Sequence, residues 1–482
     1  MKINFKKVYR TLLYAMPVVL FFSFWPWINF GTNSTMNFDV SMPLIWLVLF
    51  DCLAFVFIIK KKLLKEVVSR WAWLLFPGFL TISILWSHDK LRSILVMGIL
   101  WLLYFAVFAF YVLKDEISDK NFLRNFLRIF FGAGLFACGW CLIQCIMDVA
   151  GLTQVNTLLC NGCVYKIFGF PHPNGFAAEP QFMGNLLLAP IFVSLYLLVK
   201  KKSYFSRKSL LAMFFVFVAT LFLTLSRGAI YAFVVAMAFF TIAWSIKKTW
   251  RVMWVWLMVF LAFLFTLNLQ GIFSEVSKTD DTYISGVSKV VNQLTLGIVD
   301  LGGSQVKKDN IESTGDDKSD DPGGSSEEDV DAAPEKNNED AIFDGYVEVS
   351  TSSRVNLWQS ALKTWGKDSA TMLFGVGVGS GLISMYESGA MNTSREIVNN
   401  QYVSLLLEGG IVGVALLIVS LALVFRVVCK IQDKLLIISL IIAYMVSLLF
   451  FSGLPNALHI YLLTGLLVVI SRNSSLGNSN IA

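Results

Sequence analysis

The sequence predicts an all-α, polytopic membrane protein with about twelve transmembrane helices and a large external loop between the ninth and tenth spans. Of its 482 residues, 56% are hydrophobic and only 15% are charged, whereas a soluble domain carries nearer a quarter charged residues. The apolar residues gather into runs long enough to cross a bilayer, which takes about 20 residues per helix. The basic residues gather in alternate connections between these runs. These three observations argue against a large soluble α-protein.

The apolar runs set the order of the predicted spans. The first run is too long, and too closely followed by others, to be a cleaved signal peptide. The predicted spans are 11–31, 43–60, 71–87, 94–113, 126–149, 182–199, 209–225, 229–246, 252–272, 401–425, 435–452 and 456–471.

The basic residues test this order independently. The segment before the first span and every even-numbered connection carry a cluster of lysine and arginine. Those clusters include Lys2, Lys6, Lys7, Arg10, Lys60, Lys61, Lys62, Lys65, Arg70, Lys114, Lys120, Arg124, Arg128, Lys200, Lys201, Lys202, Arg207, Lys208, Lys247, Lys248, Arg251, Arg426, Lys430 and Lys434. The short odd-numbered connections carry only Lys90, Arg92, Lys166 and Arg227. Because cytoplasmic loops are rich in lysine and arginine, both termini are predicted to be cytoplasmic.

The spans divide the chain into three parts. Residues 1–272 hold spans one to nine with an external loop at 150–181, residues 273–400 form the large external loop, and residues 401–482 hold spans ten to twelve and a cytoplasmic tail. Within the large loop, an acidic insertion at 303–345 is predicted to be disordered. Fourteen Asp and Glu between 309 and 344 stand against two lysines, so this stretch cannot bury enough apolar surface to offset its ordering entropy. An acidic recruitment segment is the alternative interpretation.

Seven cysteines are present, and most fall in or beside apolar runs, where they act as small buried hydrophobes. Cys160 and Cys163 lie in the external loop, where a disulfide is predicted in an oxidising compartment. Two further ligands that would complete a zinc site are not evident nearby, so no metal is predicted.

An ordered segment follows the acidic insertion. Residues Leu357, Trp358, Ala361 and Trp365 recur at helical spacing, which predicts a surface helix at 354–366. It leads into a run with glycine at alternate positions, 374–381. Glycine there lets the backbone approach a ligand or a neighbouring helix closely.

Arg227 is the most unusual charged residue. It lies in a very tight turn at the external mouth of the bundle, where a guanidinium is costly unless it is paired or faces water. Its planar fork of donors suits phosphate oxygens. The alternatives are snorkelling to the interface, or a structural pair with Glu179 or Glu408.

Other titratable residues are weaker candidates for a catalytic role. Arg354 heads the surface helix, Glu179 lies at the external start of the sixth span, and Glu408 lies inside the tenth. Either carboxylate could serve as a general base or as an ion-pair partner. His172 lies in the external loop and is a further candidate, ahead of His88 and His459.

Several strings, taken in order, resemble the O-antigen ligase and polymerase superfamily, the Wzy/WaaL-like group of polytopic glycosyltransferases. The strings are a tryptophan-serine turn at 86–93, a glycine and proline-asparagine loop at 169–177, a serine-arginine-glycine turn at 226–229, an arginine helix with a glycine run at 353–377, and an asparagine-tyrosine motif at 399–413. The arginine helix and the asparagine-tyrosine motif are the most specific of these. Together the strings cover residues 80 to 415.

The resemblance implies a metal-independent, inverting transfer of glycan from an undecaprenyl-diphosphate carrier on the external face of a bacterial inner membrane. Arg227 and Arg354 would bind the diphosphate and stabilise the charge on the leaving group, with Glu179 as the third catalytic residue. The resemblance implies no cofactor and no nucleic acid. Implied partners are undecaprenyl-diphosphate-linked oligosaccharides, membrane lipid and a chain-length regulator. The implied substrate-binding residues are His172, Asn174, Asn399, Asn400, Tyr402 and Glu408.

One departure from the family pattern separates its two branches. Ligases carry a histidine directly before the asparagine of the last motif, whereas this chain has Asn399, whose amide cannot accept a proton near neutral pH. We therefore expect a polymerase of the O-antigen or exopolysaccharide type. A ligase that attaches finished glycan to a lipid A core, and a flippase for lipid-linked sugars, are the alternatives. The base is unassigned, with Glu179 ahead of Glu408 and His172.

Overall fold

The computed structural model describes residues 5–23, 28–32, 36–63, 71–117, 119–150, 152, 165–166, 171–177, 179–200, 204–245, 249–276, 282–295, 346–391, 398–429, 434–452 and 457–473. The acidic insertion at 303–345 and the predicted disulfide between Cys160 and Cys163 lie outside these residues.

The fold is a bundle of helices, as the sequence predicts, with two short hairpins. In chain order the described elements are α1 (Phe5–Phe21), β1 (Ile28–Thr32), β2 (Met36–Val40), α2 (Met42–Lys60), η1 (Trp71–Leu74), α4 (Leu75–Ser83), α5 (Lys90–Val112), η2 (Lys114–Ile117), α6 (Lys120–Val149), β3 (Tyr165–Lys166), β4 (Pro171–His172), α8 (Pro180–Lys200), α9 (Arg207–Leu223), α10 (Arg227–Ser245), α11 (Thr249–Val276), α12 (Tyr283–Leu294), α13 (Tyr346–Trp365), α14 (Ser369–Phe374), α15 (Gly381–Glu387), α16 (Gln401–Cys429), α17 (Lys434–Ser447) and α18 (Leu458–Asn473).

Within the described ranges, seven helices are long and apolar enough to cross a membrane: α2, α5, α6, α8, α10, α11 and α16. Helices α17 and α18 are shorter and also apolar. Outer helices expose large apolar side chains, as on α11, where Met253 is 61% exposed and Phe260 is 54% exposed. In a bilayer these side chains face lipid rather than water. The protein is therefore a multi-pass membrane protein.

Each predicted span overlaps a described helix, but the bounds of the first span, 11–31, are wrong. Helix α1 ends at Phe21, and Ile28–Thr32 pairs antiparallel with Met36–Val40. A hydropathy window averages over five-residue strands, so an apolar hairpin that directly follows a helix is read as its continuation. The predicted surface helix is confirmed and is longer than expected, because α13 begins at Tyr346.

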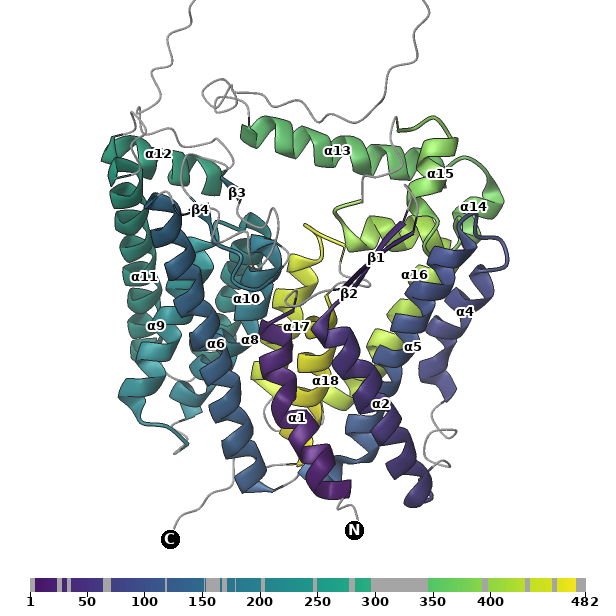
Figure 1. Cartoon of the computed structure of the whole chain (residues 1–482), viewed down its shortest axis with the longest axis horizontal. Helices are drawn as coiled ribbons and strands as arrows, with labels where there is room; N and C mark the ends of the chain where they lie inside the picture. The colour runs from purple at the N-terminus through teal and green to yellow at the C-terminus, as the bar shows by residue number, and fades with distance from the viewer. Residues whose placement is uncertain are drawn as a thin grey trace, which may run out of the picture.

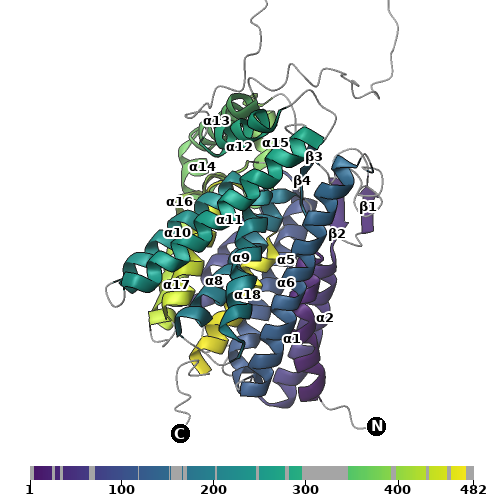
Figure 2. The ribbon, with the colours of Figure 1, turned by 90° about the vertical axis from the view of Figure 1, so that its left-hand side faces the viewer.

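The bundle has two distinct ends. Figures 1 and 2 show α12, α13, α14 and α15 gathered at one end, which we call the loop face. Helix α1 begins at the opposite end, the terminal face, and α13 lies across the loop face (Figure 1).

An ion-pair network closes the terminal face. Glu116 is 8% exposed and pairs with Lys61 and with Lys6, whose Nζ lies 3.4 Å from Glu116 Oε2. Arg10 donates from Nε to the Glu116 carbonyl oxygen at 2.8 Å and pairs with Asp119 at 3.3 Å. These contacts join α1, α2, η2 and the start of α6.

The centre of the bundle is α8. All of its residues from Met183 to Leu197 are buried, because α9, α10, α17 and α18 pack around it. Its first turn reaches the loop face and there contributes to the candidate site.

Candidate active site

The turn that carries Arg227 is short and strained. Helix α9 ends at Leu223, and α10 begins at Arg227. Leu225 between them has a φ of 50°, in the left-handed region that a branched side chain rarely occupies. Such strain persists only where the surroundings impose it, and it is concentrated at functional sites. The turn leaves Arg227 half-buried at the start of α10.

Glycine lets α8, α10 and the end of α17 meet at this turn. A Cβ at Gly228 would lie 2.7 Å from the Cβ of Phe450 and 3.1 Å from Nε2 of Gln181. A Cβ at Gly184 would lie 2.7 Å from the Cβ of Ala229. Distances this short exclude a larger residue without movement of the neighbours. Arg227 therefore lies directly beside the first turn of α8.

A buried glutamine folds the loop that precedes α8. Gln144 of α6 donates from Nε2 to Asn174 Oδ1 at 3.0 Å and to the Gly175 carbonyl oxygen at 3.1 Å. Its Oε1 accepts the Gly175 N–H at 2.9 Å. Asn174 in turn donates to the Ala177 carbonyl oxygen at 2.8 Å. Asn174, predicted to bind substrate, is thus 1% exposed and engaged in holding its own loop.

The same loop brings His172 to the Arg227 turn. His172 is 3% exposed and hydrogen-bonds the backbone of Thr224. Burial lowers the pKa of His172 to about 3; the Thr224 bond opposes this shift, and the Arg227 guanidinium adds to it. The imidazole is therefore neutral at physiological pH and is a very weak base.

Glu179 lies within the electrostatic influence of Arg354. Glu179 directly precedes α8, and its side chain is exposed. Surrounding protein nevertheless desolvates its carboxyl enough to raise the pKa above the ordinary value, while the Arg354 guanidinium of α13 opposes that rise. Arg354 is half-buried. The sequence places these two residues 175 positions apart, and the fold brings them into electrostatic contact.

The asparagine-tyrosine motif reaches the same region through the end of α17. Asn400 Oδ1 accepts the backbone N–H groups of Tyr402 and Val403 at 3.0 and 3.2 Å, so Asn400 caps α16. The Gln401 N–H donates to the Leu448 carbonyl oxygen at 2.9 Å. Two residues further on, Phe450 packs against Gly228.

Tyr402 and Asn399 flank that cap. The Tyr402 hydroxyl donates to the Met445 carbonyl oxygen at 2.8 Å, which fixes α16 against α17. Asn399 is half-buried. The motif thus lies beside the Arg227 turn, and two of its members serve to hold helix ends together.

Glu408 has a different setting. Helix α16 is broken at Gly410, which has a φ of 61° and a ψ of −168°. The glycine run fills the break: the N–H of Val376 donates to the Leu407 carbonyl oxygen at 2.9 Å, and that of Gly377 to the Glu408 carbonyl oxygen at 3.0 Å. The Glu408 carboxylate accepts the Gly381 N–H at 3.3 Å.

The tryptophan-serine turn holds the other side of the glycine run. Ser87 Oγ lies 2.5 Å from Ser93 Oγ and 2.7 Å from Ser380 Oγ, all of them buried. The Val378 N–H donates to Ser83 Oγ at 3.1 Å. This arrangement secures the loop face between α4, α5 and α16.

The strings singled out in the sequence therefore form two groups. One surrounds Arg227 at the meeting point of α8, α10 and α17. The other joins the glycine run to α5 and α16. Helix α13 connects them: Leu357 and Ala361 are buried on the α15 and α16 side, while Arg354, one turn earlier, acts on Glu179. Sequence reasoning assigns no role to Gln144, although a polar residue inside an apolar span is a recognisable signal.

Replacing Gln144 with leucine is expected to destabilise the protein by about 2–4 kcal/mol, because it leaves the Asn174 side chain and both Gly175 backbone groups buried without their partner. Thermal unfolding of the purified protein in detergent measures the loss. Gln359, exposed on α13, provides the control, since Gln359→Leu removes no such bond. An unchanged melting temperature for Gln144→Leu would contradict the role of this network.

A family model described as O-antigen ligase matches residues 212–418, from within α9 to within α16. The matched stretch contains Arg227, Arg354 and the asparagine-tyrosine motif, and it begins after Glu179 and His172. No curated protein sequence matches the chain. The match over residues 212–418 supports the resemblance to the O-antigen ligase and polymerase superfamily that the order of the motifs predicts.

Proposed function

We propose that the protein is a glycan polymerase that transfers a polyprenyl-diphosphate-linked glycan onto the non-reducing end of a lipid-linked repeat unit. In this reaction an acceptor hydroxyl attacks the anomeric carbon of the donor. A new glycosidic bond forms, the bond from the anomeric carbon to the diphosphate oxygen breaks, and polyprenyl diphosphate leaves. The anomeric configuration inverts because the displacement is single. The acceptor proton passes to a carboxylate of the protein.

The observation that carries this proposal is that two guanidinium groups act on the short segment before α8, Arg227 on His172 and Arg354 on Glu179. Glu179 responds to the charge of Arg354, and His172, on the loop just before Glu179, responds to the charge of Arg227. The first turns of α8 and α10 are in contact at Gly228. Two cations held in place before the reaction suit a diphosphate whose negative charge grows in the transition state. They supply the positive charge that the leaving group requires.

Glu179 is the general base in this proposal. Desolvation raises the pKa of its carboxyl, so it accepts a proton more readily than an ordinary glutamate. The lowered pKa of about 3 makes His172 unsuitable. The Glu408 carboxylate is engaged with the Gly381 N–H.

The choice of polymerase over ligase rests on Asn399, which stands where ligases carry a histidine. An asparagine amide cannot take the acceptor proton. That role then falls to Glu179. A ligase that attaches finished glycan to a lipid A core is the second candidate, favoured only by the description of the matching family.

A flippase would use broken helices and charges near the membrane centre. Helix α16 is broken, which is the one feature that favours this reading. At the break, however, the Leu407 and Glu408 carbonyl groups accept hydrogen bonds from Val376 and Gly377, so these two groups are not free for a substrate. We therefore retain glycosyl transfer.

In this proposal the loop face lies outside the cytoplasmic membrane and the terminal face lies in the cytosol. The basic clusters support this orientation, since Lys61, Lys114 and Arg10 gather at the terminal face with Glu116.

The pH dependence of transfer tests the role of Glu179. The base must be ionised to act, so the rate is expected to fall as the pH drops through the raised pKa of Glu179, at a higher pH than for an ordinary glutamate. Glu179→Gln removes the base and is expected to lower the rate at least about 100-fold. The pKa of Glu179 is higher in the folded protein than in the unfolded chain, so its ionised carboxylate destabilises the fold at neutral pH. Glu179→Gln removes this charge and should therefore not lower the melting temperature at neutral pH. A variant that keeps both its rate and the acid limb of its profile would rule out this assignment.

A gel ladder of surface glycan from cells with and without the gene separates the candidate functions. Loss of a polymerase leaves single repeat units on the surface acceptor. Loss of a ligase leaves long chains on the lipid carrier and none on the acceptor, and loss of a flippase traps repeat units on the cytoplasmic side. Either of the last two patterns overturns the proposal.

A further inference from the structure

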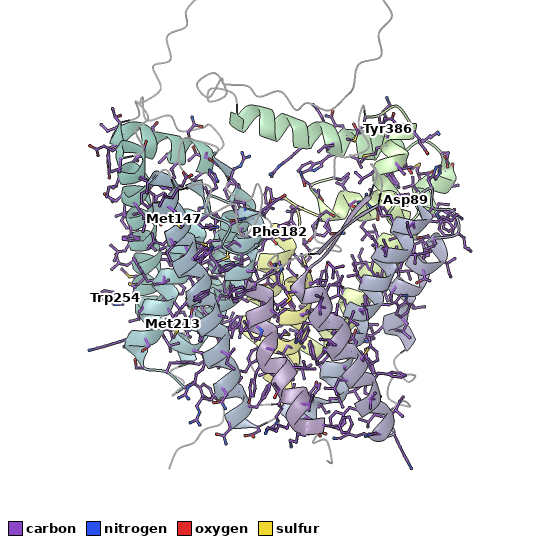
Figure 3. All side chains as sticks on the ribbon, viewed as in Figure 1. Asp89, Met147, Phe182, Met213, Trp254 and Tyr386 are labelled. Carbon is purple, nitrogen blue, oxygen red and sulfur yellow. The ribbon has the colours of Figure 1, made fainter. Side chains whose placement is uncertain are left out.

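Phe182 lies beside the proposed base. It is in the first turn of α8, and its N–H donates to the Glu179 carbonyl oxygen at 3.1 Å. This bond places Phe182 one turn after Glu179, at the start of α8. Figure 3 labels Phe182 near the centre of the loop-face half, below α13.

The Phe182 ring contacts a buried aromatic residue but is not itself fully buried. Its centroid lies 5.5 Å from that of Phe451 in a T-shaped contact, and Phe451 is 5% exposed. Phe182 itself is half-buried. The adjacent Phe450 packs on Tyr231, with centroids 5.8 Å apart, and against Gly228. Phe182 therefore belongs to a group of aromatic side chains at the starts of α8 and α10, three residues after Glu179 in the chain and in contact with Gly228 beside Arg227.

We propose that Phe182 is the surface on which the terminal sugar of the acceptor stacks, so that it determines acceptor binding; this inference rests on the proposed function. The acceptor hydroxyl must come within about 2.6–3.2 Å of the Glu179 carboxylate to give up its proton. The sugar that carries this hydroxyl then lies within reach of the next turn of α8.

Sugar and aromatic surfaces are chemically matched. One face of a pyranose presents C–H groups, and the face of an aromatic ring carries partial negative charge. Ligand sites combine such apolar surfaces with a few directed polar groups. The two guanidinium groups suit the diphosphate of the donor, whereas Phe182 offers nothing to an anion. The charges therefore hold the donor, and the ring holds the acceptor.

The inference is tested with full-length purified protein and lipid-linked repeat units extracted from cells that lack the gene. Acceptor and donor concentrations are varied separately, with a fluorescent label on the acceptor. Phe182→Leu is expected to raise the acceptor KM about tenfold while kcat and the donor KM change less than about twofold. Phe182→Tyr and Phe182→Trp are expected to restore the acceptor KM, because they keep the aromatic face.

Phe136→Leu is the matched control, since Phe136 is 57% exposed on α6 and stacks on Phe22 and Phe176. It should leave both KM values unchanged. A rise in the donor KM of Phe182→Leu would show that the ring contacts the polyprenyl chain instead, and an unchanged acceptor KM would also overturn the inference. Wild-type protein that never lengthens the labelled acceptor would overturn the proposed function itself.

Discussion

Arg227→Ala is expected to abolish chain extension, with a fall in transfer rate of at least about 100-fold, the loss typical of removing one group that stabilises transition-state charge. The guanidinium lies at a turn that holds Leu225 at a φ of 50°, so it is placed before the substrate arrives. Arg227→Lys should rescue poorly, because a point charge does not reproduce a bidentate fork. Rates measured with lipid-linked repeat units, and the surface glycan ladder, both report the loss.

Arg354→Ala is expected to behave in the same way, and the double variant should lose less than the sum of the two single losses in activation free energy. Groups that grip one diphosphate act as a unit, so their effects are not additive. Arg124, exposed on α6, provides the control, because Arg124→Ala removes a cation at the terminal face only. Full activity in Arg227→Ala protein would exclude the proposed chemistry.

The sequence predicted the helices well because a membrane imposes one strong rule on them. A span must be apolar and long, so α2, α5, α6, α8 and α11 can be recognised one at a time. The hairpin of residues 28–40 could not be recognised in this way, since its register depends on pairing between two short strands. A local sequence pattern thus predicts helices, whose hydrogen bonds join residues four apart, better than it predicts paired strands.

The candidate site was only partly predictable for the same reason. The sequence singles out Arg227 and Arg354 because a cation near the hydrocarbon boundary is costly. Glu408 stood out too, but its carboxylate meets the Gly381 N–H, and Asn400 caps α16. No sequence pattern separates a polar residue that binds substrate from one that completes a neighbour's hydrogen bonds. That distinction requires the tertiary contacts.

For the glycine run, the sequence predicts the close backbone approach but not the partner that is approached. Alternate glycines predict close backbone approach, to either a ligand or a helix. In the structure the approach is to α16: a Cβ at Gly375 would lie 2.3 Å from the Glu408 carbonyl oxygen. Backbone groups freed by a break in a membrane helix must find partners, because lipid offers none. The run supplies them.

Gly410→Ala should therefore strongly destabilise the fold. Its φ of 61° and ψ of −168° fall in a region that only glycine occupies readily, and an added Cβ would lie 2.4 Å from the Leu373 carbonyl oxygen and 2.6 Å from the Gly375 nitrogen. These are backbone atoms that cannot swing aside, so the glycine run would have to leave the break and expose its hydrogen-bonding groups. We expect a loss of at least about 3 kcal/mol, measured as membrane accumulation and melting temperature.

Two matched glycines separate the causes of this loss. Gly389 has a φ of 66° but no atom within 4 Å of an added Cβ, so Gly389→Ala carries the backbone cost alone, about 1 kcal/mol. Gly132 lies within α6 with nothing within 4 Å, and Gly132→Ala should be neutral or stabilising by up to about 1 kcal/mol, because alanine is the better helix former. If Gly410→Ala protein melts no lower than Gly389→Ala protein, the contact between the glycine run and α16 does not hold the loop face together.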